Sequence, residues 1–407
     1  MEKDRLKARL QLRDFKLNAL LQITKTINDN LPIESLLAKY QVTLKEDLDV
    51  SKLILFYWRE NRWNCILKYG VPDGSENFDT EKIFAKRSQI HLIQQDLDHE
   101  LHNFDILIPV FHREQPLAYL LLGDVNEEEI KMSPSVKHMN FIQTLTNLIV
   151  VAIENKRMAK ENIRQERMNK ELELAAELQS MLVPSALPSN EKIDMASHYR
   201  PHQQVGGDYY DYIELNENEF CICVADVSGK GISAAFVMSN FQAYLRALLN
   251  FSNSLTELVI ELNKKVVDTV KGERFITFFI AKYNYATRQL NYINAGHNHP
   301  LLYDGDTLSY LDKGCVGLGM LDKIKNITEG NVTLKPNSCL LCYTDGLVEV
   351  ENPENKEFGT EQLENILISG YQLKMKTINN QIMETLEVFR KDNPYPDDIA
   401  LISCRIF

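Results

Sequence analysis

Four acidic motifs in the C-terminal half constrain this chain more than any other feature of its sequence. They are VGGDYYD with Asp208 and Asp211, ADVSGKG with Asp226, YTDG with Asp345, and DDIAL with Asp397 and Asp398. Each motif lies at the end of an apolar run that favours a β-strand, or in the turn after such a run. Because a strand end is rigid, carboxylates held there can meet at one point with little further loss of conformational entropy.

Taken singly, each motif is an ordinary turn signal, since aspartate is favoured in turns. Together they indicate a shared site, and carboxylates that converge repel one another unless a cation neutralises them. A set of oxygen ligands favours hard cations such as Mg²⁺ or Mn²⁺ over zinc or copper. The motifs therefore predict a carboxylate-bridged metal centre in the C-terminal half of the chain.

Length and charge limit the classes of protein to consider. The 407 residues predict two or three domains, and the formal net charge of −12 argues against nucleic acid as a partner. No apolar run reaches the roughly 18 residues of a membrane span, and the segment Met1–Lys7 lacks the apolar core of a signal peptide. We therefore expect a cytoplasmic protein that binds neither nucleic acid nor a membrane.

The pattern of apolar residues predicts an α/β protein in three parts: residues 1–150, 151–188 and 189–407. In the first part, leucines from Leu6 to Leu21 follow a helical period, and strand-like runs at Lys52–Trp58 and Trp63–Tyr69 flank a Glu60-Asn61 turn. In the third part, periodicity predicts helices over 233–249, 255–270, 361–368 and 377–389, a hairpin over 275–294, and a last strand over 399–406.

The middle part predicts one long helix, because residues 141–182 contain neither glycine nor proline. Asn155, Asn162 and Asn169 are seven residues apart, as in coiled coils where asparagine at the a position sets a parallel register. A signalling coiled coil would make the protein a homodimer. The alternative is a solvated linker helix that pairs with nothing.

Five motifs occur in an order that resembles one family. They are VGGDYYDY at 205–212, VADVSGKG at 224–231, NAGHN at 294–298, YTDGL at 343–347 and DDIAL at 397–401. In this order they resemble the SpoIIE/RsbU-type phosphatases, bacterial members of the PPM (type 2C) metal-dependent serine/threonine phosphatases. The preceding LELAAELQSMLVP at 172–184 resembles the helix that leads into such domains. The resemblance covers about residues 170–407 and implies an αββα sandwich.

The resemblance also implies a catalytic centre with two Mn²⁺ or Mg²⁺ ions, formed by Asp208, Asp226, Asp345 and Asp397. Asp226 would bridge the metals, with the backbone carbonyl of Val227 as a further ligand. Asp345 and Asp397 would hold the first metal. Asp208 and Asp211 would serve the second metal directly or through its waters.

The rest of the sequence fits hydrolysis without a covalent intermediate. Two metal ions can activate a water molecule and neutralise a phosphate ester, and the chain lacks a Cys-x5-Arg loop or a G-x-S-x-G elbow that would supply a nucleophile. No general acid is assigned. His297 in NAGHN is either that acid or a structural residue that caps backbone groups, and Lys230 with its loop amides is a candidate anion contact.

The order of elements in residues 10–155 resembles a GAF domain, which implies a sensor of an unnamed ligand or upstream regulator. By resemblance, the substrate would be a phosphorylated STAS-domain anti-anti-sigma factor in a bacterial partner-switching pathway. Two alternatives stay open: a non-catalytic signalling scaffold with a phosphatase-like fold, and a phosphatase of small molecules.

Overall fold

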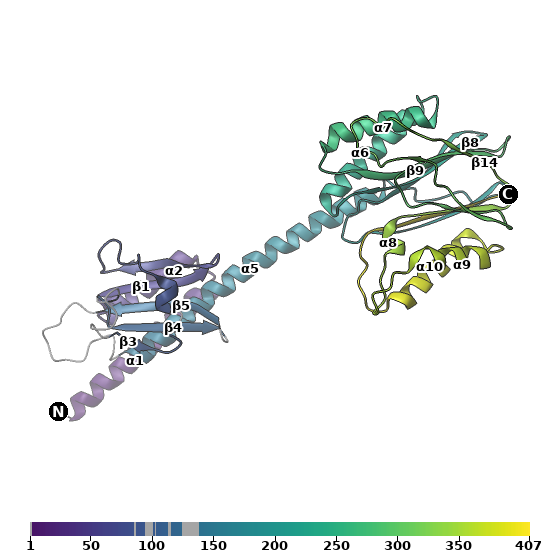
Figure 1. Ribbon diagram of the computed structural model, residues 1–407. Coiled ribbons are helices and arrows are strands. Elements are labelled where there is room, and N and C mark those ends of the chain that lie inside the picture. The colour runs from purple at the N-terminus through teal and green to yellow at the C-terminus, as the bar shows by residue number, and fades with distance from the viewer. Residues whose placement is uncertain (1, 85–86, 94–100, 102, 113–114, 124–137) are drawn as a thin grey trace. The chain divides into compact units, whose positions relative to one another are not determined.

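The computed structural model describes residues 2–84, 87–93, 101, 103–112, 115–123 and 138–407 (Figure 1). The chain divides into two compact units, residues 1–166 and 167–407. Across the described residues, no helix combines the length and the apolar character needed to span a membrane.

The first unit is an antiparallel sheet with helices packed on it. Its strands have the order β2-β1-β5-β4-β3, with bounds β1 Lys52–Arg59, β2 Arg62–Tyr69, β3 His91–Leu92, β4 Ile106–His112 and β5 Gln115–Gly123. Its helices are α1 Glu2–Asn28, α2 Ile33–Val42 followed by a π-helical turn at Thr43–Asp47, the short α3 Thr80–Phe84, and the start of α5 Met139–Ser180. The predicted hairpin is confirmed, and Glu60 and Asn61 both have positive φ, as a two-residue turn of type I′ requires.

The two faces of this sheet bury different partners. Leu53, Leu55 and Leu120 belong to a core that includes Ile23 of α1 and Ile149 of α5. The opposite face carries a cluster of aromatic and aliphatic side chains around α3. The alternation of side chains along β1 and β5 therefore buries both faces of the sheet.

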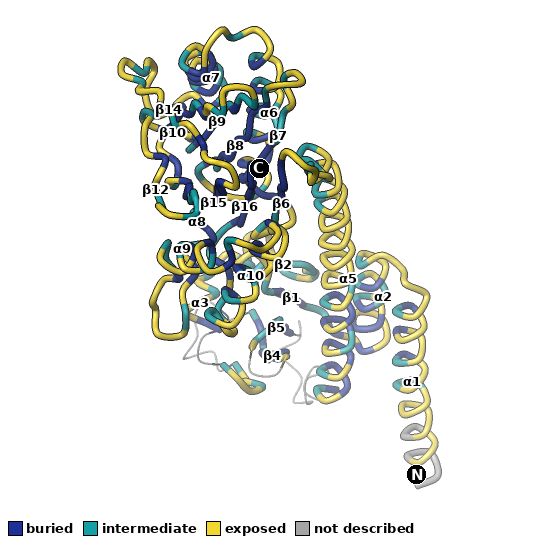
Figure 2. The backbone as a smooth tube through the Cα atoms, turned by 90° about the vertical axis from the view of Figure 1, so that its right-hand side faces the viewer, coloured by how far each residue is buried: buried dark blue, intermediate teal, exposed yellow. Residues whose placement is uncertain are grey.

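Helix α5 runs over 42 residues without a break, which confirms the uninterrupted helix predicted for the middle of the chain. All of its residues from 157 to 171 are exposed, as the colouring in Figure 2 shows.

The second unit contains two sheets. The first has the order β13-β10-β9-β8-β7, with β14 paired to β10, and its bounds are β7 Tyr209–Asn216, β8 Glu219–Val227, β9 Ile276–Asn284, β10 Gln289–Ala295, β13 Gly314–Cys315 and β14 Gly330–Thr333. The second has the order β12-β11-β15-β16-β6, with bounds β6 Ile193–Arg200, β11 Leu301–Tyr303, β12 Leu308–Tyr310, β15 Ser338–Tyr343 and β16 Ile399–Ile406. The helices are α6 Ile232–Leu249, α7 Leu255–Val270, α8 Asp345–Val348, α9 Gly359–Ser369 and α10 Met375–Arg390.

Side-chain alternation along the strands builds four layers. In β8, Cys221 and Cys223 pack on α6 and α7, whereas Ile222 and Val224 pack against the second sheet. The outer face of the second sheet packs on α9 and α10. The result is the predicted αββα sandwich, visible in Figure 1 as α6 and α7 on one side and α8 to α10 on the other.

Candidate metal centre

Four of the predicted carboxylates lie in loops or at strand ends, all at the same end of the two sheets. Asp208 directly precedes β7, Asp226 is the last residue but one of β8, Asp345 is the first residue of α8 after β15, and Asp397 lies just before β16. Tyr209 pairs with Ala225 in the β7–β8 ladder, so the register continues with Asp208 opposite Asp226. Residues opposite each other on antiparallel strands direct their side chains to the same face. Asp208 and Asp226 are therefore neighbours.

Two glycines allow the motifs to approach each other closely. A Cβ on Gly346 would lie 2.0 Å from the carbonyl oxygen of Asp398, so the YTDG turn packs directly on the backbone of DDIAL. A Cβ on Gly207 would lie 3.0 Å from the carbonyl oxygen of Val227. A side chain at either glycine would push apart the segments that carry the carboxylates.

Burial and mutual repulsion disfavour the ionised forms of Asp208, Asp226 and Asp345. Burial raises the pKa of Asp226 to about 7, with further contributions from the charges of Asp345 and Asp397. Burial, followed by the charge of Asp226, raises the pKa of Asp208 well above its ordinary value. The pKa of Asp345 is raised by burial and by Asp397. Full ionisation of the group therefore requires a cation.

The donor set fits a hard cation. The group offers carboxylate oxygens and the nearby carbonyl of Val227, with no sulfur ligand, which suits Mg²⁺ or Mn²⁺. In the part of the chain that the structure describes, no three Asp, Glu, His or Cys side chains are already closed around a metal position. The carboxylates are near enough to shift one another's pKa, and a cation would supply the attraction that draws them together.

Asp211 does not join this group. It lies three residues after Asp208 along β7 and points toward α6, where Arg246 donates two hydrogen bonds to its carboxylate at 2.8 and 3.0 Å. The hydroxyl of Tyr209, on the same face of the strand, also donates to Asp211. The predicted assignment of Asp211 to the second metal therefore does not agree with its position here. The physical reason is the two-residue period of a strand, which puts residues 208 and 211 on opposite faces.

Asp397 and Asp398 take different environments. The side chain of Asp397 is 36% exposed and forms an ion pair with Lys230, whose Nζ is 3.0 Å from Asp397 Oδ2. Asp398 is buried and accepts hydrogen bonds from the backbone N–H groups of His202 at 2.6 Å and Gly207 at 2.5 Å. Asp398 thus anchors the loop before Asp208, a role that sequence reasoning missed because its partners are almost 200 residues away.

The loop between β8 and α6 is held in place by hydrogen bonds and an ion pair to other segments of the fold. Lys230 donates to the carbonyl of Pro396 besides its ion pair with Asp397. Arg274 donates to the carbonyl of Ser228 and, at 2.6 Å, to the hydroxyl of Ser233. The sequence singled out Lys230, but it held no signal for Arg274, which lies beyond α7.

His297 is buried beside the centre. Its Nδ1 is 2.8 Å from the hydroxyl of Thr277, the residue that pairs with Asp226 across the β8–β9 ladder. Burial lowers the pKa of His297 to about 4, so the imidazole is neutral near pH 7. The turn is capped by Asn294, whose side-chain oxygen accepts from the backbone N–H of His297 at 2.8 Å. Backbone capping in this motif therefore comes from the asparagine.

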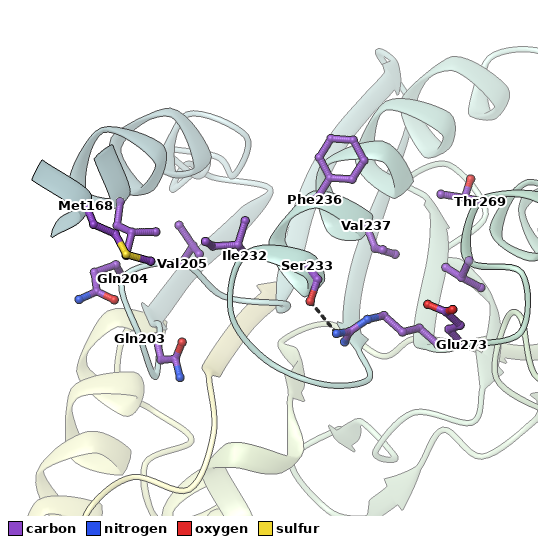
Figure 3. A pocket seen from close by; sticks show the side chains of 13 residues that line it. Met168, Gln203, Gln204, Val205, Ile232, Ser233, Phe236, Val237, Thr269 and Glu273 are labelled. Atoms are coloured by element: carbon purple, nitrogen blue, oxygen red, sulfur yellow. Dashed lines mark hydrogen bonds between the residues drawn. The ribbon is translucent and has the colours of Figure 1, made fainter. Parts of the chain in front are cut away.

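A cavity of about 750 Å³ lies next to these loops (Figure 3). Its lining includes Met168 of α5, Gln203 and Val205 of the loop before Asp208, Phe236 of α6, and Glu273. None of the predicted metal ligands lines it. The cavity therefore adjoins the backbone that carries Asp208 without being the carboxylate site.

Comparisons with known proteins agree with this geometry. Residues 216–407 match the profile of the family described as Stage II sporulation protein E (SpoIIE). Phosphoserine phosphatase RsbU of Bacillus subtilis is 27% identical over 249 residues, which cover 59% of this chain and 71% of that protein. Phosphoserine phosphatase RsbP of the same organism is 26% identical over 186 residues, covering 44% of this chain and 45% of RsbP.

Among solved structures, the PP2C domain of SiaA from Pseudomonas aeruginosa matches with a TM-score of 0.55 at 20% identity. The match covers 60% of this chain and 99% of that domain, and it shows a shared fold. Residues 216–407 therefore form a domain of the SpoIIE type, the C-terminal unit shares its fold with a PP2C domain, and the similarity to RsbU supports a protein phosphatase.

Proposed function

We propose that this protein is a metal-dependent serine/threonine phosphatase that dephosphorylates a STAS-domain anti-anti-sigma factor in a bacterial partner-switching pathway. The observation that carries the proposal is the crowding of Asp208, Asp226 and Asp345 at one edge of the sandwich, with their pKa values raised by burial and by one another. Similarity to the phosphoserine phosphatases RsbU and RsbP supports a phosphorylated serine as the target.

Phosphatases of the PP2C type are metal-dependent, and we propose two Mn²⁺ or Mg²⁺ ions here. Asp226 would bridge them with the carbonyl of Val227 as a further ligand, Asp345 and Asp397 would hold the first ion, and Asp208 would serve the second. When bound, such ions supply an activated water molecule and neutralise the phosphate. Asp211 is left out of this set because Arg246 already engages both of its oxygens.

The chain's own residues would hold this centre in shape. The hydroxyl of Thr344 donates to Asp208 Oδ2 at 2.7 Å and so fixes which carboxylate oxygen faces the centre. Asp398 fixes the backbone of the loop before Asp208. Lys230 neutralises part of the charge of Asp397, and its ammonium group would be a candidate contact for a phosphate oxygen.

For the rest of the chain, we propose a GAF-like sensor in the N-terminal unit and a homodimer that pairs through α5. The pairing is supported by Asn155, Asn162 and Asn169, which are exposed at heptad spacing, and by Met158, which is 51% exposed.

The first experiment measures hydrolysis of p-nitrophenyl phosphate and of a phosphorylated STAS-domain protein with Mn²⁺, Mg²⁺ or EDTA. Wild type is compared with Asp226→Asn and Asp345→Asn, and Asp268→Asn, at an exposed position of α7, is the matched control. We expect metal-dependent activity that is lost in the first two variants and kept in the control.

Other results would favour the alternatives. Hydrolysis of small phosphate esters without action on any phosphoprotein would indicate a small-molecule phosphatase. No hydrolysis of either substrate with any metal would indicate a scaffold.

A further inference from the structure

The C-terminal end of α5 is joined to the loop before Asp208 by one side chain, that of Gln179. Its Nε2 donates to the carbonyl oxygen of Gly206 at 2.6 Å, and the N–H of Gly206 donates to its Oε1 at 3.1 Å. The amide group therefore pairs with both backbone groups of a single residue, as a neighbouring β-strand would. Gln179 is 8% exposed, so water does not compete freely for these bonds.

Gly206 lies in a segment without regular secondary structure, between β6 and β7. It is packed so tightly that a Cβ there would be 2.5 Å from the hydroxyl of Tyr199 and 2.6 Å from Asp398 Oδ2. Asp398 holds the next residue, Gly207, and Gln179 holds Gly206 itself. The backbone that leads into Asp208 is thus held by hydrogen bonds to two side chains from different parts of the fold.

The contacts made by Asp398 and by Gln179 differ in the hydrogen-bonding groups that they require. The carboxylate of Asp398 only accepts, from two backbone N–H groups. Gln179 must both donate and accept, which a carboxylate or an aliphatic side chain of the same length cannot do. Loss of this amide would leave a buried N–H and a buried C=O without partners, which costs more than the two bonds are worth on balance.

Neighbouring side chains of α5 offer little replacement for this contact. Leu178 of α5 is 65% exposed and Met181, just after the helix, is 74% exposed, so the apolar side chains closest to Gln179 on either side point to solvent. Position 179 is buried between them and faces the loop.

We propose that Gln179 is a positioning residue of the phosphatase centre, which fixes Gly206 and thereby the place of Asp208 relative to Asp226. The inference rests on the proposed function for its consequence, which is metal affinity. The contact itself is independent of metal.

The test uses the full chain with Gln179→Met and Gln179→Glu, which keep the side-chain length but remove both bonds or the donor. Glu177→Met, at an exposed position of α5 two residues before Gln179, is the matched control. Amide hydrogen exchange is measured in EDTA on peptides that span residues 202–210. Mn²⁺ binding is measured by calorimetry, and KM and kcat for p-nitrophenyl phosphate are measured at saturating Mn²⁺.

We expect faster exchange in residues 202–210 for both variants at position 179, and Mn²⁺ affinity that is about tenfold weaker in Gln179→Met, which loses both hydrogen bonds. KM at saturating Mn²⁺ should stay within about twofold of wild type, because the substrate is held by other groups, and Glu177→Met should match wild type throughout. Loss of the donor alone should already weaken the grip, so Gln179→Glu should not restore the wild-type behaviour.

Two results would overturn the proposal: unchanged exchange in residues 202–210, or faster exchange with wild-type Mn²⁺ affinity. A lower melting temperature with normal Mn²⁺ binding would likewise show that Gln179 only stabilises the fold. Failure of the proposed function is a separate result, since it would appear as a wild type without metal-dependent hydrolysis.

Discussion

Replacement of Asp226 by asparagine is expected to stabilise the metal-free protein while it abolishes activity. Asp226 is partly buried beside other aspartates, and its pKa is raised from the ordinary 3.8 to about 7, first by burial and then by the charges of Asp345 and Asp397. Asparagine has nearly the same shape and no charge, so it removes the repulsion and keeps the packing.

The size of the effect follows from linkage between protonation and folding. A shift of about 3 pKa units corresponds to about 4 kcal/mol at 1.36 kcal/mol per unit, which is an upper limit because Asp226 shares the repulsion with its neighbours. The folded-state pKa lies above the unfolded one. The destabilisation caused by ionising Asp226 is therefore absent below about pH 4 and grows as the pH rises. At pH 7 it has reached most of its full size. We expect Asp226→Asn to gain about 2 to 4 kcal/mol at pH 7 in EDTA and almost nothing at pH 4.

The assay is urea unfolding of both proteins in EDTA at pH 7 and near pH 4, followed by the same measurement at pH 7 with Mn²⁺. Mn²⁺ should stabilise wild type and do much less for the variant, so their order of stability reverses. The exposed Asp268→Asn should follow wild type under all conditions. The reasoning is refuted if Asp226→Asn is less stable than wild type in EDTA at pH 7, or if the difference between them is the same at both pH values.

Three further changes test other contacts. Arg246→Ala should lower the free energy of unfolding by about 2 to 3 kcal/mol, somewhat below the range for fully buried pairs, because it leaves Asp211 buried without its cation while Arg246 itself is half exposed. Unaltered Mn²⁺ affinity in this variant would agree with a structural role for the pair, and an unaltered urea midpoint would contradict it. Lys230→Gln should tighten Mn²⁺ binding several-fold and raise KM for p-nitrophenyl phosphate, since it frees Asp397 from a cation at 3.0 Å; calorimetry showing weaker binding would count against this. Gly346→Ala should lower kcat at least about tenfold and reduce the melting temperature, because its Cβ would lie 2.0 Å from a backbone carbonyl oxygen, and a variant with normal rates would show that the turn can move freely.

Local patterns were sufficient for much of the C-terminal fold. The helices at 232–249 and 255–270, the hairpin of β9 and β10, and the last strand at 399–406 agree with the ranges predicted from periodicity. These elements are long and strongly patterned, and their apolar positions repeat at the period of the structure they form. The short strands β11, β12 and β14 and the mixed sequence of β6 had no such pattern, because partners in the sheet hold them in place.

The same division applies to the candidate site. An aspartate that follows an apolar run is visible in the sequence, so Asp226 and Asp345 could be recognised as ends of strands. The partner of each polar group could not be read in this way, since it depends on which distant segments meet. Asp211 accepts hydrogen bonds from Arg246, which lies 35 residues later. Asp398 accepts one from Gly207, which lies 191 residues earlier, and Gln179 donates one to Gly206. Periodicity reports which face of an element is buried, but the pairing of polar groups across the core is set when strands and helices take their register in three dimensions.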